Sequence, residues 1–268
     1  MNMNIALCIC VRNCEPFLQD IFSNIKLVKT LNVNVYSIFV YDNCSDNSPA
    51  ILEEYQKNDD NVIVRNIINT SEYRTERIAK ARNECLSIVY NELNDISFHI
   101  MIDCDDRCTP KWNIDVINNY LNNFDHDNWD CISFNRHGYY DLWALLIDDF
   151  RHHCHGYNGG NVPTLMQKYI KYRLDSCETN SIEVFSAFNG FCIYKTEKFN
   201  GLCYDGLYRN IKTLISDEDR LISLEAVKKY GLNVTIDDTW IECCEHLFYH
   251  LSAFKKGLKI KVSKFIVI

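Results

Sequence analysis

Ile96-Ser97-Phe98-His99-Ile100-Met101-Ile102 is an apolar run that leads directly into Asp103-Cys104-Asp105-Asp106. A short run rich in β-branched and aromatic residues predicts a strand. Carboxylates that follow such a strand lie at the carboxyl edge of a sheet, where open α/β sheets bind ligands. Asp103 and Asp105 can share a divalent cation and leave coordination positions for phosphate oxygens. An ordinary acidic turn explains the same residues, so the surrounding sequence has to decide between the two interpretations.

Strand-like and helix-like segments alternate through the first hundred residues. Apolar runs predict strands at residues 5–11, 35–41, 62–64 and 96–102. Between them, apolar residues at helical spacing predict helices, and these residues are Phe17, Ile21, Ile25 and Val28, then Leu52 and Tyr55, then Ile78, Cys85 and Val89. This alternation predicts an α/β fold with a doubly wound, mainly parallel sheet.

After residue 106 the pattern loosens. Ile114, Ile117, Tyr120, Leu121 and Phe124 predict a helix, and residues 130–134 predict a strand. Residues 151–163 are polar and rich in His and Gly, which is typical of a mobile or acceptor-facing loop. Within it His152, His153, Cys154 and His155 are consecutive and could suggest zinc, but adjacent residues cannot all point at one metal ion, so we expect them in a solvent-exposed loop.

The composition is that of a globular protein. The chain has 268 residues, 47% of them hydrophobic, and a formal net charge of −8. A nucleic-acid-binding protein needs a basic surface, so we expect no nucleic acid partner. No apolar stretch reaches the roughly 18 residues of a membrane-spanning helix. With no repeat and no linker in the sequence, we expect one domain over residues 1–268 and no transmembrane segment.

Fourteen cysteines are present, and Cys8, Cys10, Cys131 and Cys192 lie within apolar runs. Such placement favours buried free thiols in a reducing compartment over a disulfide framework. The apolar run at residues 5–11 is too short for a signal sequence and lacks a basic leader and a cleavage site. We therefore expect a cytoplasmic protein.

Two further polar features follow predicted strands. Arg12 and Asn13 come after Val11 at the end of the first strand, where a cation and an amide could hold a diphosphate or a base, although a solvated loop is the alternative. Asp42 follows the second strand and could accept hydrogen bonds from a nucleobase or ribose, although helix capping is the alternative.

An Arg-rich helix is the third feature. In Tyr73-Arg74-Thr75-Glu76-Arg77-Ile78-Ala79-Lys80-Ala81-Arg82-Asn83, Arg74, Arg77 and Ala81 share one face, and Lys80 and Arg82 flank it. Arginine forks suit phosphate, and the start of a helix adds a favourable dipole. A charged face in contact with solvent would explain the same run.

Together, these motifs resemble nucleotide-sugar-dependent glycosyltransferases of the GT-A fold. The segments at residues 73–79 and 139–145 also resemble fungal capsule-associated mannosyltransferases and related giant-virus sugar transferases. The resemblance covers roughly residues 5–261. It implies a Rossmann-like sheet with a smaller mixed sheet on the acceptor side, a donor-binding half at residues 1–106 and an acceptor-binding half at residues 107–268. If the chain is viral, its location would be the host cytoplasm.

The resemblance also implies roles in donor binding. Asp105 and Asp103 would ligate Mn²⁺ or Mg²⁺ at the diphosphate, and Asp103 would also act in catalysis. The metal would act as a Lewis acid on the departing nucleoside diphosphate. The residues expected to bind the donor are Val11, Arg12, Asn13, Asp42, Arg77, Arg82, Asp103, Cys104 and Gly190.

On the acceptor side, Glu245 would be the general base if the reaction inverts the anomeric configuration, or an electrostatic stabiliser if it retains it. A helix-start carboxylate with no catalytic role is the alternative. The residues expected to bind the acceptor are Asp141, Trp143, Asn189 and His246, and His250 is a candidate third metal ligand. The family usually places that histidine further downstream, where this chain has Lys255, Lys256 and Lys259.

The sequence thus predicts a metal-dependent glycosyltransferase that moves a hexose from a UDP- or GDP-sugar to a hydroxyl of a glycan or glycoconjugate. A nucleotidyltransferase is one alternative, because it would use a similar sheet and carboxylate pair but release pyrophosphate. A non-catalytic nucleotide-sugar-binding module is another, although Asp103, Asp105 and Glu245 are all present.

Overall fold

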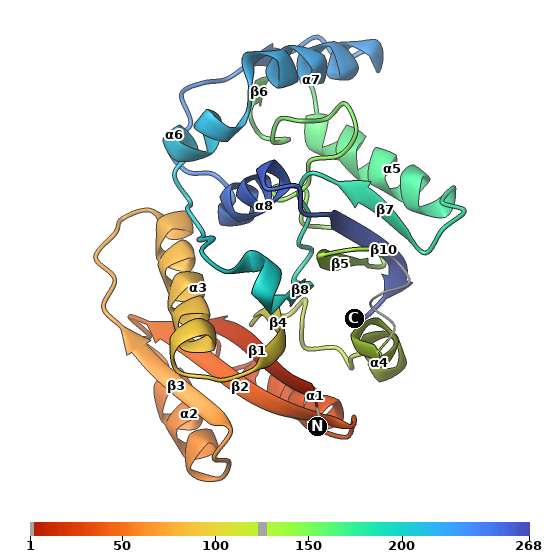
Figure 1. The fold of residues 1–268 in the computed structure, drawn as a ribbon. Coiled ribbons are helices and arrows are strands. Elements are labelled where there is room, and N and C mark those ends of the chain that lie inside the picture. Colours follow the sequence, from red (N-terminus) through yellow and green to blue (C-terminus); the bar gives the residue numbers. More distant parts are fainter. Residues whose placement is uncertain (1–2, 123–127) are drawn as a thin grey trace.

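The computed structural model describes residues 3–122 and 128–268. Its centre is an eight-stranded sheet in the order β3-β2-β1-β4-β8-β5-β10-β7 (Figure 1). The first four strands along the chain are β1 (Met3–Val11), β2 (Val33–Asp42), β3 (Val62–Ile67) and β4 (Ile96–Asp103). They pair in parallel, so their carboxyl ends lie at one edge of the sheet. The predicted strands and their direction are confirmed.

Three helices connect these strands, as predicted: α1 (Leu18–Val28), α2 (Ser48–Lys57) and α3 (Arg74–Asn91). The buried residues of α1 and α2 belong to the hydrophobic core on one face of the sheet, and those of α3 belong to the core on the other face. The chain winds outward from β1 through α1 and α2 on one face, and then returns through α3 on the other face to place β4 beside β1, which produces the doubly wound arrangement. Because α3 packs on β1 and β2, its polar residues at the sheet edge meet the ends of those strands.

The second half continues the same sheet with mixed strand directions. Strand β8 (Phe191–Lys195) lies antiparallel between β4 and β5 (Cys131–Asn135). Strand β10 (Ile260–Ile266) pairs in parallel with β5 and antiparallel with β7 (Ser181–Val184). The observed sheet is therefore the mainly parallel GT-A type, with its mixed part on the side of the later strands.

The remaining elements surround this mixed part (Figure 1). The predicted helix after the acidic junction is α4 (Ile114–Asn122), and Phe124 lies outside the described residues. The other helices are α5 (Val162–Asp175), α6 (Tyr208–Ile211), α7 (Asp217–Lys229) and α8 (Glu245–Lys255), with two 3₁₀ turns, η1 (Thr196–Phe199) and η2 (Lys212–Leu214). Strands β6 (Tyr157–Asn158) and β9 (Thr235–Ile236) form a small separate sheet.

The prediction of a solvent-exposed loop at residues 152–155 is wrong for His152, His153 and Cys154, which are buried. His152 and His153 are only 1% and 0% exposed. The rings fit because Gly156 leaves room for them: a Cβ there would lie 2.3 Å from Nε2 of His152 and 2.6 Å from Nε2 of His153. Burial lowers the pKa of His152 to about 4, so its ring is neutral near pH 7. Polar residue type alone does not reveal such a neutral, buried imidazole.

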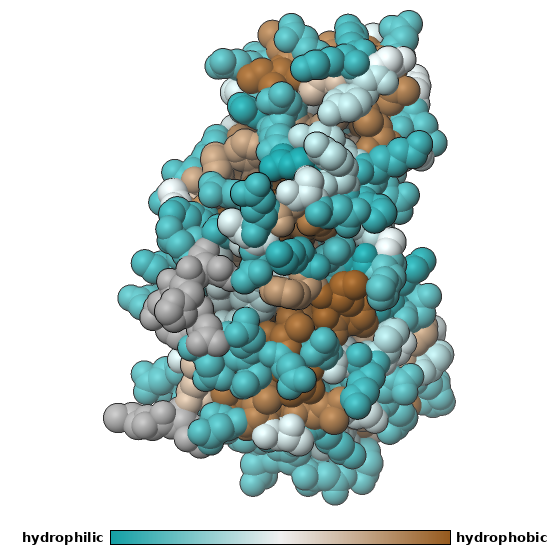
Figure 2. All heavy atoms as spheres, turned by 90° about the vertical axis from the view of Figure 1, so that its right-hand side faces the viewer, coloured by the Kyte–Doolittle hydropathy of each residue, from teal (hydrophilic) through white to brown (hydrophobic). Residues whose placement is uncertain are grey.

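Within residues 3–122 and 128–268, no helix combines the length and the apolar character needed to span a bilayer. Figure 2 views the molecule from the right-hand side of Figure 1 and shows mostly hydrophilic residues on that face, with hydrophobic residues gathered at and below mid-height.

Candidate active site

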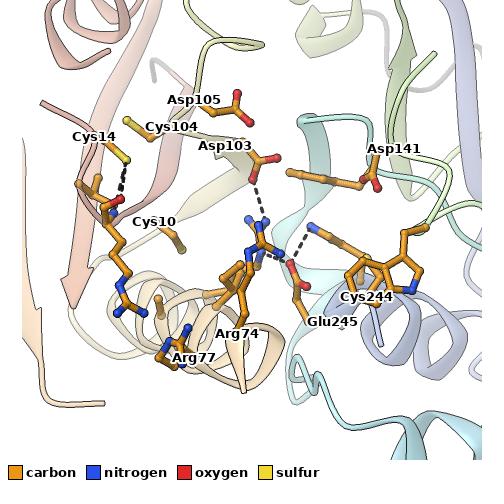
Figure 3. A pocket seen from close by; sticks show the side chains of 18 of the residues that line it. Cys10, Cys14, Arg74, Arg77, Asp103, Cys104, Asp105, Asp141, Cys244 and Glu245 are labelled. Carbon is orange, nitrogen blue, oxygen red and sulfur yellow. Dashed lines mark hydrogen bonds and ion pairs between the residues drawn. The ribbon is translucent and has the colours of Figure 1, made fainter. Parts of the chain in front are cut away.

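A cavity of about 540 Å³ lies at the carboxyl edge of the parallel strands, within the size range of ligand sites. Strands β1, β2 and β4, helix α3 and the start of α8 all contribute to its wall. Figure 3 shows Asp103 and Asp105 on one side of it, Arg74 and Arg77 on another, and Asp141 and Glu245 on a third. The predicted site residues that line it are Val11, Arg12, Asp42, Arg77, Arg82, Asp103, Cys104, Asp105, Asp141, Trp143, Glu245 and His246.

The acidic side of the cavity is formed where β4 ends. The amide of Asp103 donates to the carbonyl of Gly190 at 3.1 Å, which places the aspartate beside β8. Asp105 Oδ1 accepts hydrogen bonds from the amides of Arg107 (3.0 Å) and Cys108 (3.2 Å). Burial, and then the nearby charge of Asp103, raise the pKa of Asp105. Two close carboxylates therefore repel each other here, and a bound cation would relieve that repulsion.

The carboxylate oxygens of Asp103 and Asp105 fit Mn²⁺ or Mg²⁺, because both ions prefer oxygen ligands. A group of three His, Cys, Asp or Glu residues whose ligand atoms lie within 4.8 Å of one another occurs once in the described part of the chain, at Cys131, Cys192 and His250. That group does not include Asp103 or Asp105. The residues present can therefore supply two carboxylates, and bound substrate and water would complete the shell.

His250 is not brought to the two aspartates. It is 0% exposed and does not line the cavity. Its Nδ1 lies 3.0 Å from Ser186 Oγ, and its Nε2 lies 2.9 Å from Tyr194 OH. This side of α8 faces the sheet, so the helix geometry directs His250 into the core. His246, one turn earlier, does line the cavity and stacks on Phe188 at 3.7 Å between ring centroids.

The cationic side is formed by Arg12, Arg74 and Arg77. Arg77 Nη1 donates to the carbonyls of Ser71 (2.9 Å) and Glu72 (2.8 Å), which holds its guanidinium at the start of α3. In a chain with a formal net charge of −8, three arginines on one wall form a local site for an anion.

Asp42 lies at the end of β2 and is 5% exposed. Its Oδ2 is buried and has no hydrogen-bond partner within the described residues. Burial raises its pKa, and Arg12 and Arg77 partly oppose that change. A buried carboxylate oxygen without a partner is costly unless a ligand satisfies it, so Asp42 is suited to accept a ligand N–H or O–H.

Arg82 connects the two halves of the site. Its Nη2 donates to Asp103 Oδ1 and its Nε donates to Glu245 Oε1, both at 2.9 Å. The guanidinium also lies over the rings of Phe188 (4.8 Å) and Tyr204 (5.8 Å). The sequence predicted Arg82 in donor binding, and the observed geometry adds an ion-pair network that fixes Glu245, the first residue of α8, relative to β4.

Asp141 lies on the third side of the cavity, the side that also holds Glu245. It accepts hydrogen bonds from the amides of Ala144 and Asn189, both at 3.3 Å. Burial, and then the charges of Asp103 and Glu245, raise its pKa to about 7. Its protonation state is therefore responsive to whatever binds nearby.

Three other predicted residues shape the cavity without lining it. Asn189 is 1% exposed, donates to the carbonyl of Phe134, and accepts from the amides of Tyr140 and Asp141. Gly190 has a φ of +84°, and a Cβ there would lie 2.5 Å from Tyr140 OH. Asn13 accepts from the amide of Ser45 at 2.7 Å and so ties the loop after β1 to the loop after β2.

Sequence reasoning missed Tyr140 as a site residue. Its hydroxyl is buried and unpartnered within the described residues, and its ring centroid lies 5.6 Å from the guanidinium of Arg107 and 5.2 Å from that of Arg136. Tyr140 belongs to a motif that was noted in the sequence, but no periodic pattern indicates which of its residues faces the cavity. Arg74, Phe188, Cys14 and Cys244 also line the cavity and were not predicted as site residues.

Comparisons with solved structures give low sequence identity. S. aureus TarS 1–349 in complex with UDP is 16% identical, with a TM-score of 0.45, and the match covers 90% of this chain and 60% of that one. Mannosyltransferase PcManGT from Pyrobaculum calidifontis, in complex with GDP-Man and Mn²⁺, is 12% identical, with a TM-score of 0.46, and covers 76% of this chain and 48% of that one. The chain thus spans less than two thirds of the length of both proteins.

A search of curated proteins gives no match. The family comparison is decisive, because the model described as Glycosyl transferase family 2 matches residues 6–185, which is more than half of the chain. These residues include the parallel strands, the Arg-rich helix and the acidic junction that build most of the cavity. The chain therefore belongs to glycosyl transferase family 2.

Proposed function

We propose that this protein is a metal-dependent glycosyltransferase that moves a hexose from a UDP- or GDP-sugar to a hydroxyl of a glycan or glycoconjugate. The observation that carries the proposal is the arrangement of charge around one cavity. Asp103 and Asp105 lie on one side, Arg74 and Arg77 on another, and Glu245 on a third. A nucleoside diphosphate needs cationic groups and metal-binding oxygens together, and a transferred sugar needs a carboxylate beside it.

The donor would lie along the edge of the parallel strands. Arg12, Arg74 and Arg77 would bind the diphosphate, since guanidiniums hold phosphate oxygens with paired hydrogen bonds. Asp42 would accept hydrogen bonds from the base or the ribose through its unpartnered Oδ2. Val11 and Cys104 would line the same part of the cavity, along the edge of the parallel strands, which we call the donor trough.

Asp103 and Asp105 would hold Mn²⁺ or Mg²⁺ with their carboxylate oxygens. When bound, this ion supplies Lewis-acid stabilisation of the charge that develops on the departing nucleoside diphosphate. The protein's own contribution is to fix the two carboxylates in advance: Arg82 orients Asp103, and the amides of Arg107 and Cys108 orient Asp105. Groups held in place before the reaction need no reorganisation during it.

Glu245 would act on the acceptor. The Arg82 ion pair and the start of α8 fix its carboxylate at the cavity wall. In an inverting reaction it takes the proton from the acceptor hydroxyl, and in a retaining reaction it stabilises developing positive charge on the sugar. Asp141, Trp143 and His246 line the cavity beside Glu245 and would contact the acceptor.

We also propose the finer assignments that rest on sequence. Residues 1–106 would form the donor-binding half and residues 107–268 the acceptor-binding half of one domain. The likeness to fungal capsule-associated and giant-virus sugar transferases supports a role in glycan assembly. Most of the cysteines are buried and all are free thiols, which supports a reducing, cytoplasmic setting.

The test is product analysis. The purified protein is incubated with a panel of UDP- and GDP-hexoses and MnCl₂, and the nucleotide products are separated by ion-exchange chromatography. A glycosyltransferase releases UDP or GDP from at least one donor, by transfer or by slow hydrolysis. A parallel incubation supplies UTP or GTP with hexose 1-phosphates. Release of pyrophosphate there, without release of UDP or GDP from the donors, would establish a nucleotidyltransferase, and binding without turnover would establish a non-catalytic module.

A further inference from the structure

A second cavity, of about 570 Å³, lies between helix α5 and the segment that follows β5. We call it the basic groove. Its charged and ionisable lining residues are Arg136, His137, Lys168, Lys171 and Asp175. Its volume falls within the range of about 300–1,000 Å³ that is usual for ligand sites. None of these residues belongs to the donor-binding set described above.

The basic groove carries positive charge that the protein does not neutralise. Lys171 is paired with Asp175 at 2.6 Å. Neither Arg136 nor Lys168 has a carboxylate within ion-pairing distance in the described part of the chain. Two uncompensated cations in one groove stand out in a chain with a formal net charge of −8. Such a local field attracts anions.

The basic groove is connected to the candidate active site through Arg136. This side chain donates from Nη1 to the carbonyl of Arg107 at 2.6 Å, and its guanidinium lies 5.2 Å from the ring centroid of Tyr140. Its Nη2 would lie 3.3 Å from a Cβ on Gly190, the residue whose carbonyl accepts from the amide of Asp103. Arg136 and the Tyr140 ring therefore lie where the basic groove comes close to the acidic side of the active-site cavity.

The position of the groove matches an acceptor chain more closely than a donor. The donor trough lies along β1, β2 and β4, whereas the groove is lined by residues after β5 and on α5. Gln167 of α5 donates to the carbonyl of Tyr139 at 3.1 Å, which ties the helix to the segment that carries Tyr140 and Asp141. A molecule in the groove would thus rest against the same segment that forms the acceptor-side wall.

We propose that the basic groove binds an acidic unit of the acceptor glycan. This unit would lie a few sugar units away from the hydroxyl that is glycosylated. The unit carries either a carboxylate, as in a uronic acid, or a phosphate, as in a phosphodiester-linked glycan. Arg136 would bind this anion through the guanidinium N–H groups that do not bond to Arg107 and Cys108, and Lys168 would bind it as a point charge. This inference rests on the proposed function, because it assigns the substrate class of the same reaction.

The test measures binding of defined probes by isothermal titration calorimetry. Trigalacturonate represents a carboxylate glycan, a tetramer of glycerol phosphate represents a phosphate glycan, and maltotriose is the neutral control. We expect at least one acidic probe to bind with an affinity that falls as salt increases, because exposed charges are screened. Maltotriose should bind at least about tenfold more weakly, a difference that corresponds to about 1.4 kcal/mol.

Two variants with the same change of charge, one inside the basic groove and one outside it, show whether the acidic probe binds in the groove. Lys168→Glu reverses an exposed charge in the groove, and Lys229→Glu reverses an exposed charge on α7 that does not line the groove. Lys168→Glu should weaken binding of the acidic probe by about tenfold or more, whereas Lys229→Glu should leave it at the wild-type value. Lys168→Ala should give a smaller loss in the same direction.

Release of UDP or GDP, measured on the same samples, separates this proposal from the proposed function. We expect Lys168→Glu to hydrolyse the donor at the wild-type rate, because Lys168 does not line the donor cavity. Absence of turnover in the wild type would overturn the proposed function and leave the binding result standing. The groove proposal is overturned if neither acidic probe binds the wild type, if maltotriose binds equally well, or if the two charge reversals have equal effects.

Discussion

The two halves of the molecule form one sheet but present their functional residues in different ways. In residues 1–106, parallel strands end at one edge, and Val11, Asp42 and Asp103 are the last residues of their strands. In residues 107–268, the cavity is lined by Tyr140, Asp141 and Trp143 from an irregular segment and by the first turn of α8. The first half positions side chains by topology, and the second positions them by individual tertiary contacts.

This difference teaches which kind of function each half can carry. A repeated strand edge provides a rigid base for the part of a substrate that many enzymes share, such as a nucleoside diphosphate. Irregular segments held by single contacts, such as those of Asn189 with Tyr140 and Asp141, can vary more freely and so suit a particular acceptor. Four substitutions test this division, and they follow in decreasing order of expected effect.

Glu245→Gln should separate acceptor chemistry from donor binding most sharply. Glutamine can still accept a hydrogen bond from Arg82, but it cannot take a proton or stabilise positive charge. We expect sugar transfer to slow by about 10²- to 10⁴-fold, while the Kd for the nucleotide-sugar stays within about threefold. Transfer is measured with a radiolabelled donor, and Kd is measured by calorimetry.

Glu218→Gln is the matched control, because Glu218 is an exposed first-turn carboxylate on another helix, α7. Glu218→Gln should leave both the rate of sugar transfer and the Kd for the nucleotide-sugar unchanged. Wild-type transfer by the Glu245 variant would show that the catalytic group on the acceptor side lies elsewhere.

Arg82→Met should weaken the connection between the halves. Removal of the guanidinium leaves Asp103 and Glu245 without their shared partner, and Glu245 is 5% exposed. A buried charge that loses its partner costs about 3–5 kcal/mol, so the free energy of unfolding in urea should fall by that amount. Arg65→Met removes a more exposed ion pair with Glu92 and should cost only about 0–1 kcal/mol. Similar losses in both variants would mean that the Arg82 network does not stabilise the junction.

Gly190→Ala should disturb the segment that carries Tyr140. Gly190 and Gly201 both have a positive φ, of +84° and +76°, so alanine at each should cost about 1–2 kcal/mol in backbone strain. Only at Gly190 would the new Cβ meet a side chain, the hydroxyl of Tyr140. Transfer should therefore fall by about 10- to 100-fold for Gly190→Ala and stay unchanged for Gly201→Ala. Equal activity in the two variants would argue against a fixed Tyr140.

His99 gives the smallest predicted effect, a change in stability with pH. It lies in β4, stacks on Tyr194 of β8, and burial lowers its pKa to about 3 from an ordinary value of 6.5. Below pH 6.5 the unfolded chain therefore binds a proton that the folded chain excludes. The contribution of His99 to the free energy of unfolding is fully present above pH 6.5 and is lost as pH falls towards 3. At pH 5.5 one such histidine lowers the free energy of unfolding by about 1.4 kcal/mol.

The measurement is the difference in urea stability between pH 7.5 and pH 5.5. In His99→Gln this difference should shrink by about 1.4 kcal/mol, whatever the absolute stability of the variant. An unchanged difference in the His99 variant would contradict a neutral, buried imidazole between the two halves.

The arrangement of residues 1–106 could be predicted from sequence because its signals are periodic. Alternating strands and helices determine the edge at which Asp42 and Asp103 appear, and the run of charge in α3 indicates the cationic wall. The individual role of Arg82 could not be predicted, because a helical face does not show which arginine will meet Asp103 and which will meet solvent.

Residues 107–268 were harder to predict because their contacts are long-range. His246 and His250 share a helical face in the sequence, yet one lines the cavity and the other contacts Tyr194 and Ser186 in the core. Asn189 was expected at the acceptor, and the structure shows that its side chain holds the backbone of Tyr140 and Asp141, a contact that the sequence did not indicate. Such outcomes depend on which element packs against each side chain, and that information is absent from local patterns.

Thermal unfolding with nucleotide-sugars, in the presence and absence of Mn²⁺, tests the central claim most directly. A donor at 100 times its Kd adds about 2.7 kcal/mol of stability, which corresponds to a rise in Tm of about 5–10 °C. We predict such a rise for the wild type with at least one UDP- or GDP-hexose plus Mn²⁺, and its loss in Asp105→Asn. No rise with any donor, or an equal rise in the Asp105 variant, would contradict a nucleotide-sugar site at this acidic edge.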